Sequence, residues 1–156
     1  MKYGKLLSNM NHTILPIPAG WTGHFITIVT QDREHFLGEI KNRDMHFNTA
    51  GIIAGITWHE ISDCRNFLVR GEYVIMPNHI HGILLIKENS TIEEMKRQAD
   101  LSNIIRSYKG TVKKFCNQYN VNLKWQPGFH DQRIKSELEY QHKIHYIREN
   151  VKNWES

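Results

Sequence analysis

The sequence predicts a single α+β domain in which helices pack against a β-sheet. A chain of 156 residues is long enough for one compact domain and too short to favour two. Two extended apolar segments, residues 73–76 and 79–86, flank the turn-forming pair Pro77-Asn78, which predicts an antiparallel hairpin. Three further stretches carry apolar residues at helical intervals, so the class is mixed rather than all-β.

The first third of the chain predicts an arm, a strand and a helix. Residues 1–20 are polar and interrupted by Pro16 and Pro18, so we expect an N-terminal arm, and residues 21–156 form the folded domain. Residues 25–29 are β-branched and apolar on both faces, which indicates a central strand. Residues 47–61 predict a helix packed on the sheet, with Asn48 or Thr49 as its N-cap.

The rest of the chain predicts a strand and two more helices. Residues 66–69 begin an extended segment that leads into the hairpin. Residues 88–100 are charged and without a clear period, which favours a mobile connection or a frayed helical start. Residues 103–119 predict a second helix capped by Ser102. Residues 137–154 predict a third helix whose apolar stripe faces the sheet.

Composition limits the compartment and the partners. The chain has 20 Lys and Arg against 16 Asp and Glu, a formal charge of +4 and a pI near 9.1, which is compatible with a polyanionic partner. Cys64 and Cys116 are too few for a disulfide framework or a thiolate zinc site. Neither a signal segment nor a run of roughly 18 apolar residues is present, so we expect a soluble cytoplasmic protein with no membrane partner.

His79 and His81 lie two residues apart in the second strand of the hairpin. Side chains alternate along a strand, so both imidazoles face the same way, an arrangement that suits a metal ion. His79 lies next to the turn, where a site can stay open to substrate. The alternative interpretation is an ordinary pair of half-exposed histidines.

A basic ridge follows the second predicted helix. Arg106, Lys109 and Lys113 are three and four residues apart and align on one face. The candidate contacts to a nucleic-acid backbone are Arg106, Lys109, Lys113, Lys114 and Arg133. Three ring side chains lie among them in the sequence and are candidates for positions near the DNA strand or in support of the site: Trp125, Phe129 and His130. Cations with flat rings can follow a phosphate backbone and stack bases. A solvated helix face with a core tryptophan would give the same pattern.

The last predicted helix places three polar groups on one edge. Tyr146 and Asn150 are four residues apart, and His142 lies one turn earlier. Packing alone also explains a tyrosine on a terminal helix.

Three blocks in order resemble the single-tyrosine HUH transposases, particularly the REP-associated tyrosine transposase branch. These blocks are residues 76–82 (Met-Pro-Asn-His-Ile-His-Gly), 125–131 (Trp-Gln-Pro-Gly-Phe-His-Asp) and 146–150 (Tyr-Ile-Arg-Glu-Asn). Residues 23–39 and 101–115 also resemble the family, so the likeness covers nearly all of the chain beyond residue 20.

The resemblance implies a ferredoxin-like antiparallel sheet with helices packed on one face. It implies that His79 and His81 hold a divalent cation, Mg²⁺ or Mn²⁺, with Asn150 completing the metal site. It assigns Tyr146 as the nucleophile that forms a 5′-phosphotyrosine link to single-stranded or hairpin DNA. A phenol has a reference pKa of about 10, so it must lose its proton as it attacks, and His142 or water is the candidate acceptor.

Two alternatives to the transposase interpretation come from other classes. A domesticated, non-catalytic single-stranded DNA or hairpin binder would keep the basic ridge, but it needs none of His79, His81, Tyr146 and Asn150. A histidine-triad nucleotide hydrolase would need a third histidine at position 83, where the chain has Ile83. The sequence leaves the oligomeric state open between a monomer and a homodimer.

Overall fold

The computed structural model describes residues 14–63, 65–88 and 91–155. The strands are β1 Trp21–Val29, β2 Gly38–Lys41, β3 Asp44–Phe47, β4 Leu68–Ile75, β5 His79–Lys87 and β6 His130–Ile134. The helices are α1 Thr49–His59, α2 Thr91–Gln118 and α3 Glu137–Glu149, and a 3₁₀ turn, η2, spans Gln31–Arg33. The predicted α+β class is confirmed.

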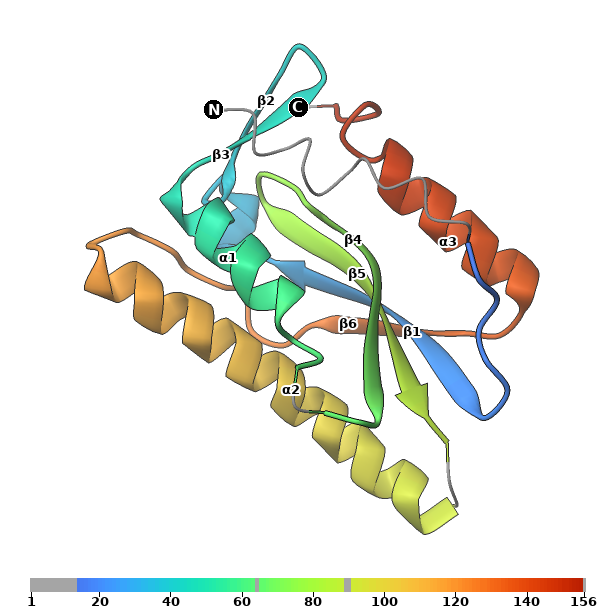
Figure 1. The fold of residues 1–156 in the computed structure, drawn as a ribbon. Helices are drawn as coiled ribbons and strands as arrows, with labels where there is room; N and C mark the ends of the chain where they lie inside the picture. The colour runs from blue at the N-terminus through green and yellow to red at the C-terminus, as the bar shows by residue number, and fades with distance from the viewer. Residues whose placement is uncertain (1–13, 64, 89–90, 156) are drawn as a thin grey trace.

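Four strands form one antiparallel sheet in the order β4-β5-β1-β6, with β1 and β5 at its centre (Figure 1). The chain order β1-α1-β4-β5-α2-β6 on this sheet is the β-α-β-β-α-β pattern of ferredoxin-like folds. The hairpin at Pro77-Asn78 forms as expected, because Ile75 pairs with Ile80 across it. Strands β2 and β3 form a separate hairpin outside this sheet.

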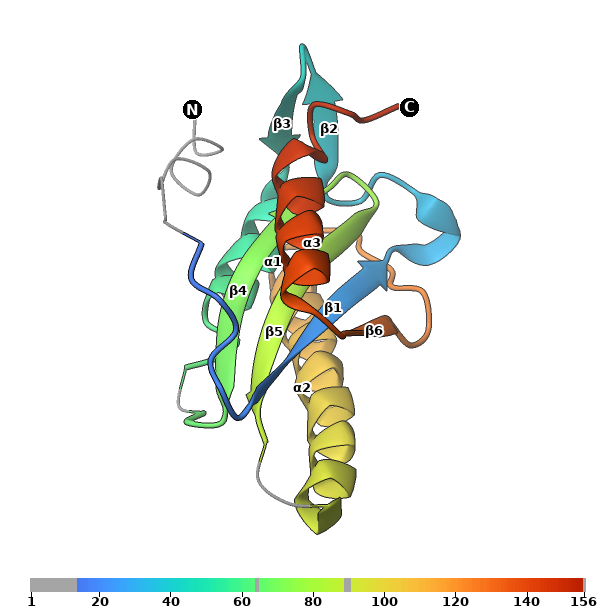
Figure 2. The ribbon, with the colours of Figure 1, turned by 90° about the vertical axis from the view of Figure 1, so that its right-hand side faces the viewer.

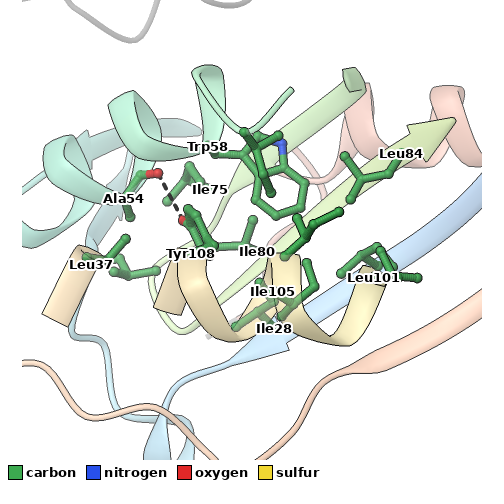
Figure 3. Close-up of a cluster of buried hydrophobic side chains, with 14 of the residues drawn as sticks. Ile28, Leu37, Ala54, Trp58, Ile75, Ile80, Leu84, Leu101, Ile105 and Tyr108 are labelled. Atoms are coloured by element: carbon green, nitrogen blue, oxygen red, sulfur yellow. Dashed lines mark hydrogen bonds between the residues drawn. The ribbon is translucent and has the colours of Figure 1, made fainter. Parts of the chain in front are cut away.

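Helices α1 and α2 cover one face of the sheet. Trp58 of α1 is fully buried and meets the edge of Tyr108 of α2, with ring centroids 5.2 Å apart (Figure 3). The hydroxyl of Tyr108 donates to the carbonyl of Ala54 at 2.9 Å, so the polar end of this buried ring is satisfied. Ile28 and Ile80 supply the sheet side of the same core.

Helix α3 covers the opposite face, so the expectation of helices on one face holds for α1 and α2 and fails for α3. Tyr140, Ile144 and Ile147 are buried against Phe25 and Ile83 of the central strands. Figure 2 shows α3 in front of the sheet, with α1 and α2 behind it. The physical reason is that β1 and β5 are apolar on both faces, and each face requires its own cover.

The predicted helices exist, but their limits and faces differ. In α1, Asn48 is the N-cap and accepts from the Gly51 amide at 2.9 Å. Ile52 and Ile56 are nevertheless exposed, because the buried face is built from small residues and Trp58. Helix α2 begins at Thr91 rather than near residue 103, so Ser102 lies inside it.

The third helix is shorter than predicted. It is capped by Ser136, whose hydroxyl accepts from the Glu139 amide at 3.1 Å. It ends at Glu149 rather than at residue 154, and residues 150–153 form turns. The chain therefore bends back before Trp154, which matters for the site described below.

Three strands, β2, β3 and β6, were missed in the sequence. The β2–β3 hairpin alternates inward and outward residues and turns through Asn42 and Arg43, both at positive φ, so its pattern was available. Strand β6 has only one buried residue, Ile134, and carries no apolar signal. It forms because β1 offers it a free edge.

The predicted N-terminal arm falls outside the described residues up to residue 13. Ile14 and Ile17 pack against the core under α3, and the Ile17 amide donates to a Glu137 carboxylate oxygen at 3.4 Å. No helix in the described part of the chain is both long and apolar enough to cross a bilayer.

Candidate functional site

The two histidines of β5 form a close pair on the face that α3 covers. His79 is opposite Val29 and His81 is opposite Thr27 of β1, and both side chains leave the sheet on the same side as Phe25. Their ring centroids are 4.5 Å apart. The strand spacing thus does what the sequence predicted: it places two imidazoles side by side.

Hydrogen bonds hold the Nδ1 atom of each ring. His79 Nδ1 is 2.6 Å from Asn78 Oδ1, and the amide of Asn78 is oriented by its Nδ2, which donates to the Arg33 carbonyl at 3.2 Å. His81 Nδ1 is 2.9 Å from the Thr27 hydroxyl. With the proton of His79 on Nδ1, the lone pair of its Nε2 is free to bind a metal.

Burial keeps both rings neutral. It lowers the pKa of His79 to about 4, with a smaller contribution from the charge of Arg33. It lowers the pKa of His81 to about 3, helped by His79 and by the charge of Lys143. At neutral pH both imidazoles are therefore in the form that coordinates metals.

Helix α3 brings Tyr146 over this pair. Its buried side fixes the helix on the sheet, while Tyr146 remains 51% exposed. The Tyr146 ring lies 5.4 Å from the His81 ring and 6.2 Å from the Phe25 ring, centroid to centroid. The predicted nucleophile and the predicted ligand pair thus share one site although 65 positions separate Tyr146 from His81 in the sequence.

The end of α3 and the turn after it complete a pocket of about 200 Å³ beside His79. Its lining residues are His79, Tyr146, Asn150, Asn153, Trp154 and Glu155. Asn150 therefore lines the same pocket as His79, and its role as a metal ligand stays a prediction.

Trp154 is a site residue that the sequence reading placed in the apolar stripe of a helix. The turns after Glu149 carry it over His79, where the two rings stack with centroids 6.2 Å apart and planes 29° apart. Its ring also meets His35 at 5.6 Å. Only knowledge of where α3 ends could have revealed this contact.

The donor set fits a divalent cation. Two neutral imidazoles and one amide oxygen are ligands for Mn²⁺ or Mg²⁺ that leave coordination positions for a substrate. Among the side chains that the structure describes, no cluster of three or more His, Cys, Asp or Glu residues could hold a metal. A metal at this place would therefore depend on the amide as well as on the histidines.

His142 lies on the exposed side of α3, and its role as proton acceptor stays a prediction. It is four residues before Tyr146 on the same helix, and the structure gives it no contact with the histidine pair.

The basic ridge lies on the other side of the sheet, because α2 covers the face opposite to Tyr146 (Figure 1). The ammonium of Lys109 donates to the carbonyls of Gln126 and Gly128 at 2.7 and 2.8 Å. Lys113 donates to the carbonyl of Leu123. These two lysines tie α2 to the loop before β6.

Trp125 belongs to the same connection. Its Nε1 donates to the Lys109 carbonyl at 3.2 Å, its ring packs on the core below α2, and it bridges to Thr30 beyond β1. Phe129 packs on that core too. The structure thus gives Trp125 and Phe129 a packing role, as the alternative interpretation of the ridge allowed.

Arg106, Lys114, Arg133 and His130 are exposed. Arg133 lies 3.4 Å from a Glu88 carboxylate oxygen, a surface pair of little energetic weight. DNA contacts by these residues stay predictions.

Comparisons with known proteins agree with this architecture. The chain is 27% identical over 146 residues to an uncharacterized protein of Haemophilus influenzae strain Rd, covering 85% of this chain and 81% of that one. No protein-family profile matches the chain.

Two solved structures share the fold. The first is a REP-associated tyrosine transposase bound to a REP hairpin, with a TM-score of 0.58, 19% identity, and coverage of 93% of this chain and 80% of that one. The second is a candidate transposase of Deinococcus radiodurans, with a TM-score of 0.50, 12% identity, and coverage of 90% and 98%. The resemblance stated from the three sequence blocks is therefore found in the fold as well.

Proposed function

We propose that this protein is a metal-dependent single-stranded DNA endonuclease and strand transferase of the HUH transposase type. The observation that carries the proposal is the approach of Tyr146 to the histidine pair, with 5.4 Å between the Tyr146 and His81 rings. A pure DNA binder has no use for a tyrosine over two neutral histidines. The shared fold of a transposase bound to a REP hairpin supports a hairpin-bearing DNA end as substrate.

In the proposed reaction, the phenol oxygen of Tyr146 attacks a phosphodiester. The bond from this oxygen to phosphorus forms as the bond from phosphorus to the 3′ oxygen breaks. The phenol proton passes to His142 or to water, and the 3′ oxygen takes up a proton, so charge balances. The product is a 5′-phosphotyrosine that keeps the bond energy for rejoining without a nucleotide cofactor.

The proposed metal ligands are His79, His81 and Asn150, and the bound cation, Mg²⁺ or Mn²⁺, would polarise a non-bridging oxygen of the phosphate. The residues of this chain do the rest. Asn78 and Thr27 orient the two rings. Trp154 stacks on the ring of His79 and helps to hold it in place.

The test uses single-stranded DNA from the flanks of the gene, labelled at its 3′ end because the protein would retain the 3′ fragment. Incubation with Mn²⁺ followed by denaturing electrophoresis is expected to give a shifted covalent adduct that a chelator abolishes. The adduct should disappear in Tyr146→Phe and in His79→Ala. Tyr119→Phe, which removes another exposed tyrosine on the opposite helix layer, should keep it.

A second label at the 5′ end should report a released fragment ending in a 3′-hydroxyl. If the DNA binds but neither adduct nor released fragment forms with any divalent metal, the endonuclease proposal fails and the domesticated binder takes its place. An adduct that persists in Tyr146→Phe would move the nucleophile to another residue.

A further inference from the structure

The ammonium of Lys143 on α3 contacts two uncharged side chains near the candidate site. Its ammonium is 2.9 Å from the Gln132 side-chain oxygen on β6 and 4.3 Å from the centre of the Phe25 ring on β1. A carbonyl oxygen and an aromatic face both orient a cation without neutralising it. Three elements therefore fix the position of one positive charge.

The other described cations near the end of α3 are already paired with carboxylates. Arg148 lies 2.8 Å from a Glu72 oxygen, and Lys152 lies 3.0 Å from a Glu149 oxygen. Among the side chains that the structure describes, no carboxylate forms an ion pair with Lys143. Its charge is thus held in place and left without a counter-charge from the described chain.

The ammonium of Lys143 lies close to His81 and Tyr146, with the Phe25 ring as the shared neighbour. The Phe25 ring that carries the ammonium stacks on His81, with centroids 5.0 Å apart, and meets the edge of Tyr146 at 6.2 Å. Lys143 also precedes Tyr146 by three residues on α3, so the two side chains are neighbours on the helix surface.

We propose that Lys143 is a catalytic residue that binds a non-bridging oxygen of the scissile phosphate while Tyr146 attacks. This inference rests on the proposed function and assigns a residue outside the three sequence blocks. A cation held beside the phosphate offsets the negative charge that grows there in the transition state. The ammonium contributes no proton to the reaction, and its two neutral partners keep it in place before DNA arrives.

The inference is tested first by binding, in the Tyr146→Phe background where no adduct forms. The probe is the same single-stranded DNA, and its dissociation constant is measured at several salt concentrations. Lys143→Gln is expected to weaken binding roughly three- to tenfold at low salt and to reduce the slope of log K against log salt by about 0.7, the value for one phosphate contact with a single strand. Lys143→Arg should restore both quantities.

The second arm measures adduct formation with Tyr146 intact. Lys143→Gln is expected to lower the maximal rate of adduct formation roughly ten- to a hundredfold, beyond its effect on binding. Gln132→Met is the matched control, since it removes the neutral partner and leaves the charge. If Lys143 only fastened α3 to β6, both variants would show the same defect, and thermal melting would report it.

Lys41→Gln serves as a charge control, because it removes the same charge from the β2–β3 hairpin outside the main sheet. Equal binding, equal salt slope and an equal rate for Lys143→Gln and the parent protein would overturn the inference while leaving the proposed function intact. If the parent protein forms no adduct, the proposed function fails, and an unchanged salt slope in the binding arm overturns the phosphate contact as well.

Discussion

The tautomer of His79 depends on a chain of two hydrogen bonds. The Arg33 carbonyl fixes the orientation of the Asn78 amide, and the oxygen of that amide accepts the Nδ1 proton of His79. Arg33 and its neighbour Asp32 both have φ of 54°, a conformation that costs about 1–3 kcal/mol for each residue other than glycine. The strained turn at Asp32 and Arg33 therefore orients Asn78, and Asn78 orients His79.

Substitution of Asn78 should change the affinity of the proposed site for Mn²⁺. Asn78→Leu removes the acceptor of the Nδ1 proton, and we expect the affinity for Mn²⁺ to fall roughly ten- to a hundredfold, as for other residues behind a ligand. Asn78→Asp keeps an acceptor for the Nδ1 proton, adds a negative charge and replaces the donor to Arg33 with an oxygen, so it should retain more of the affinity than Asn78→Leu. The amount of free Mn²⁺, counted by electron paramagnetic resonance, measures both. Equal losses would mean that the bond to Arg33 is the one that matters.

The sequence was informative about residues that act through their spacing. The interval between His79 and His81 and the interval between Tyr146 and Asn150 both gave the correct common face. It was uninformative about Lys143 and Trp154, because their roles depend on where Phe25 and His79 lie in space. Those contacts join β1, β5, β6 and the turn after α3, and no local pattern records them.

At the scale of elements, α2 and the loop before β6 are fastened by Lys109. Burial lowers the pKa of the Lys109 ammonium, and two backbone carbonyls accept hydrogen bonds from it. We expect Lys109→Met to lower the free energy of unfolding by about 1–2 kcal/mol, because both carbonyls lose a charged donor. Arg106→Met, on the exposed face one turn earlier, should leave urea denaturation nearly unchanged. A stable Lys109→Met protein with weakened DNA binding would instead restore the basic-ridge interpretation.

Strand β5 approaches α1 so closely that position 82 has no room for a side chain. A methyl group at Gly82 would overlap the indole of Trp58, which is fully buried. Gly82→Ala should therefore destabilise the fold by about 1–3 kcal/mol. Gly110→Ala is the matched control: this exposed helical position has free space around it, so the same change should stabilise by up to about 1 kcal/mol. Chemical denaturation compares them, and equal effects would refute the close approach.

Prediction of the elements succeeded for the longest apolar patterns and failed for the short alternating β2–β3 hairpin. The central strands and all three helices carry a long apolar pattern. The start of α2 was missed because its first turns are charged, and β6 was missed because one buried residue gives no period. The end of α3 was placed too late, since turns that continue the helical spacing of apolar residues carry no signal of their own.

At the scale of the whole molecule, the sheet separates two tasks. The larger core below α1 and α2 holds the fold, while the smaller cluster below α3 carries the site. A central sheet that is apolar on both faces makes this division possible, and it puts the basic ridge of α2 on the face opposite to Tyr146.

The free energy of unfolding should depend on pH through the histidine pair. Their pKa values in the folded protein, about 4 for His79 and about 3 for His81, lie below the value of about 6.5 for an exposed histidine. The unfolded chain therefore binds more protons as pH falls from about 6.5, and stability is lost over this range at no more than about 1.4 kcal/mol per pH unit for each ring.

Urea denaturation at pH 7.0, 5.5 and 4.5 measures this slope. His81→Gln should make the profile shallower by removing one of the two titrating groups. A profile that is equally steep without His81 would assign the acid sensitivity to other groups.

The stacking of Trp154 on His79 gives the protein an optical reporter at its own site. A protonated imidazole quenches the emission of an indole in contact with it, and a bound paramagnetic ion quenches it too. The difference in fluorescence between the parent protein and Trp154→Phe would therefore follow the occupancy and protonation of one ligand in real time. Events at His79 could then be followed in solution with no label on the DNA.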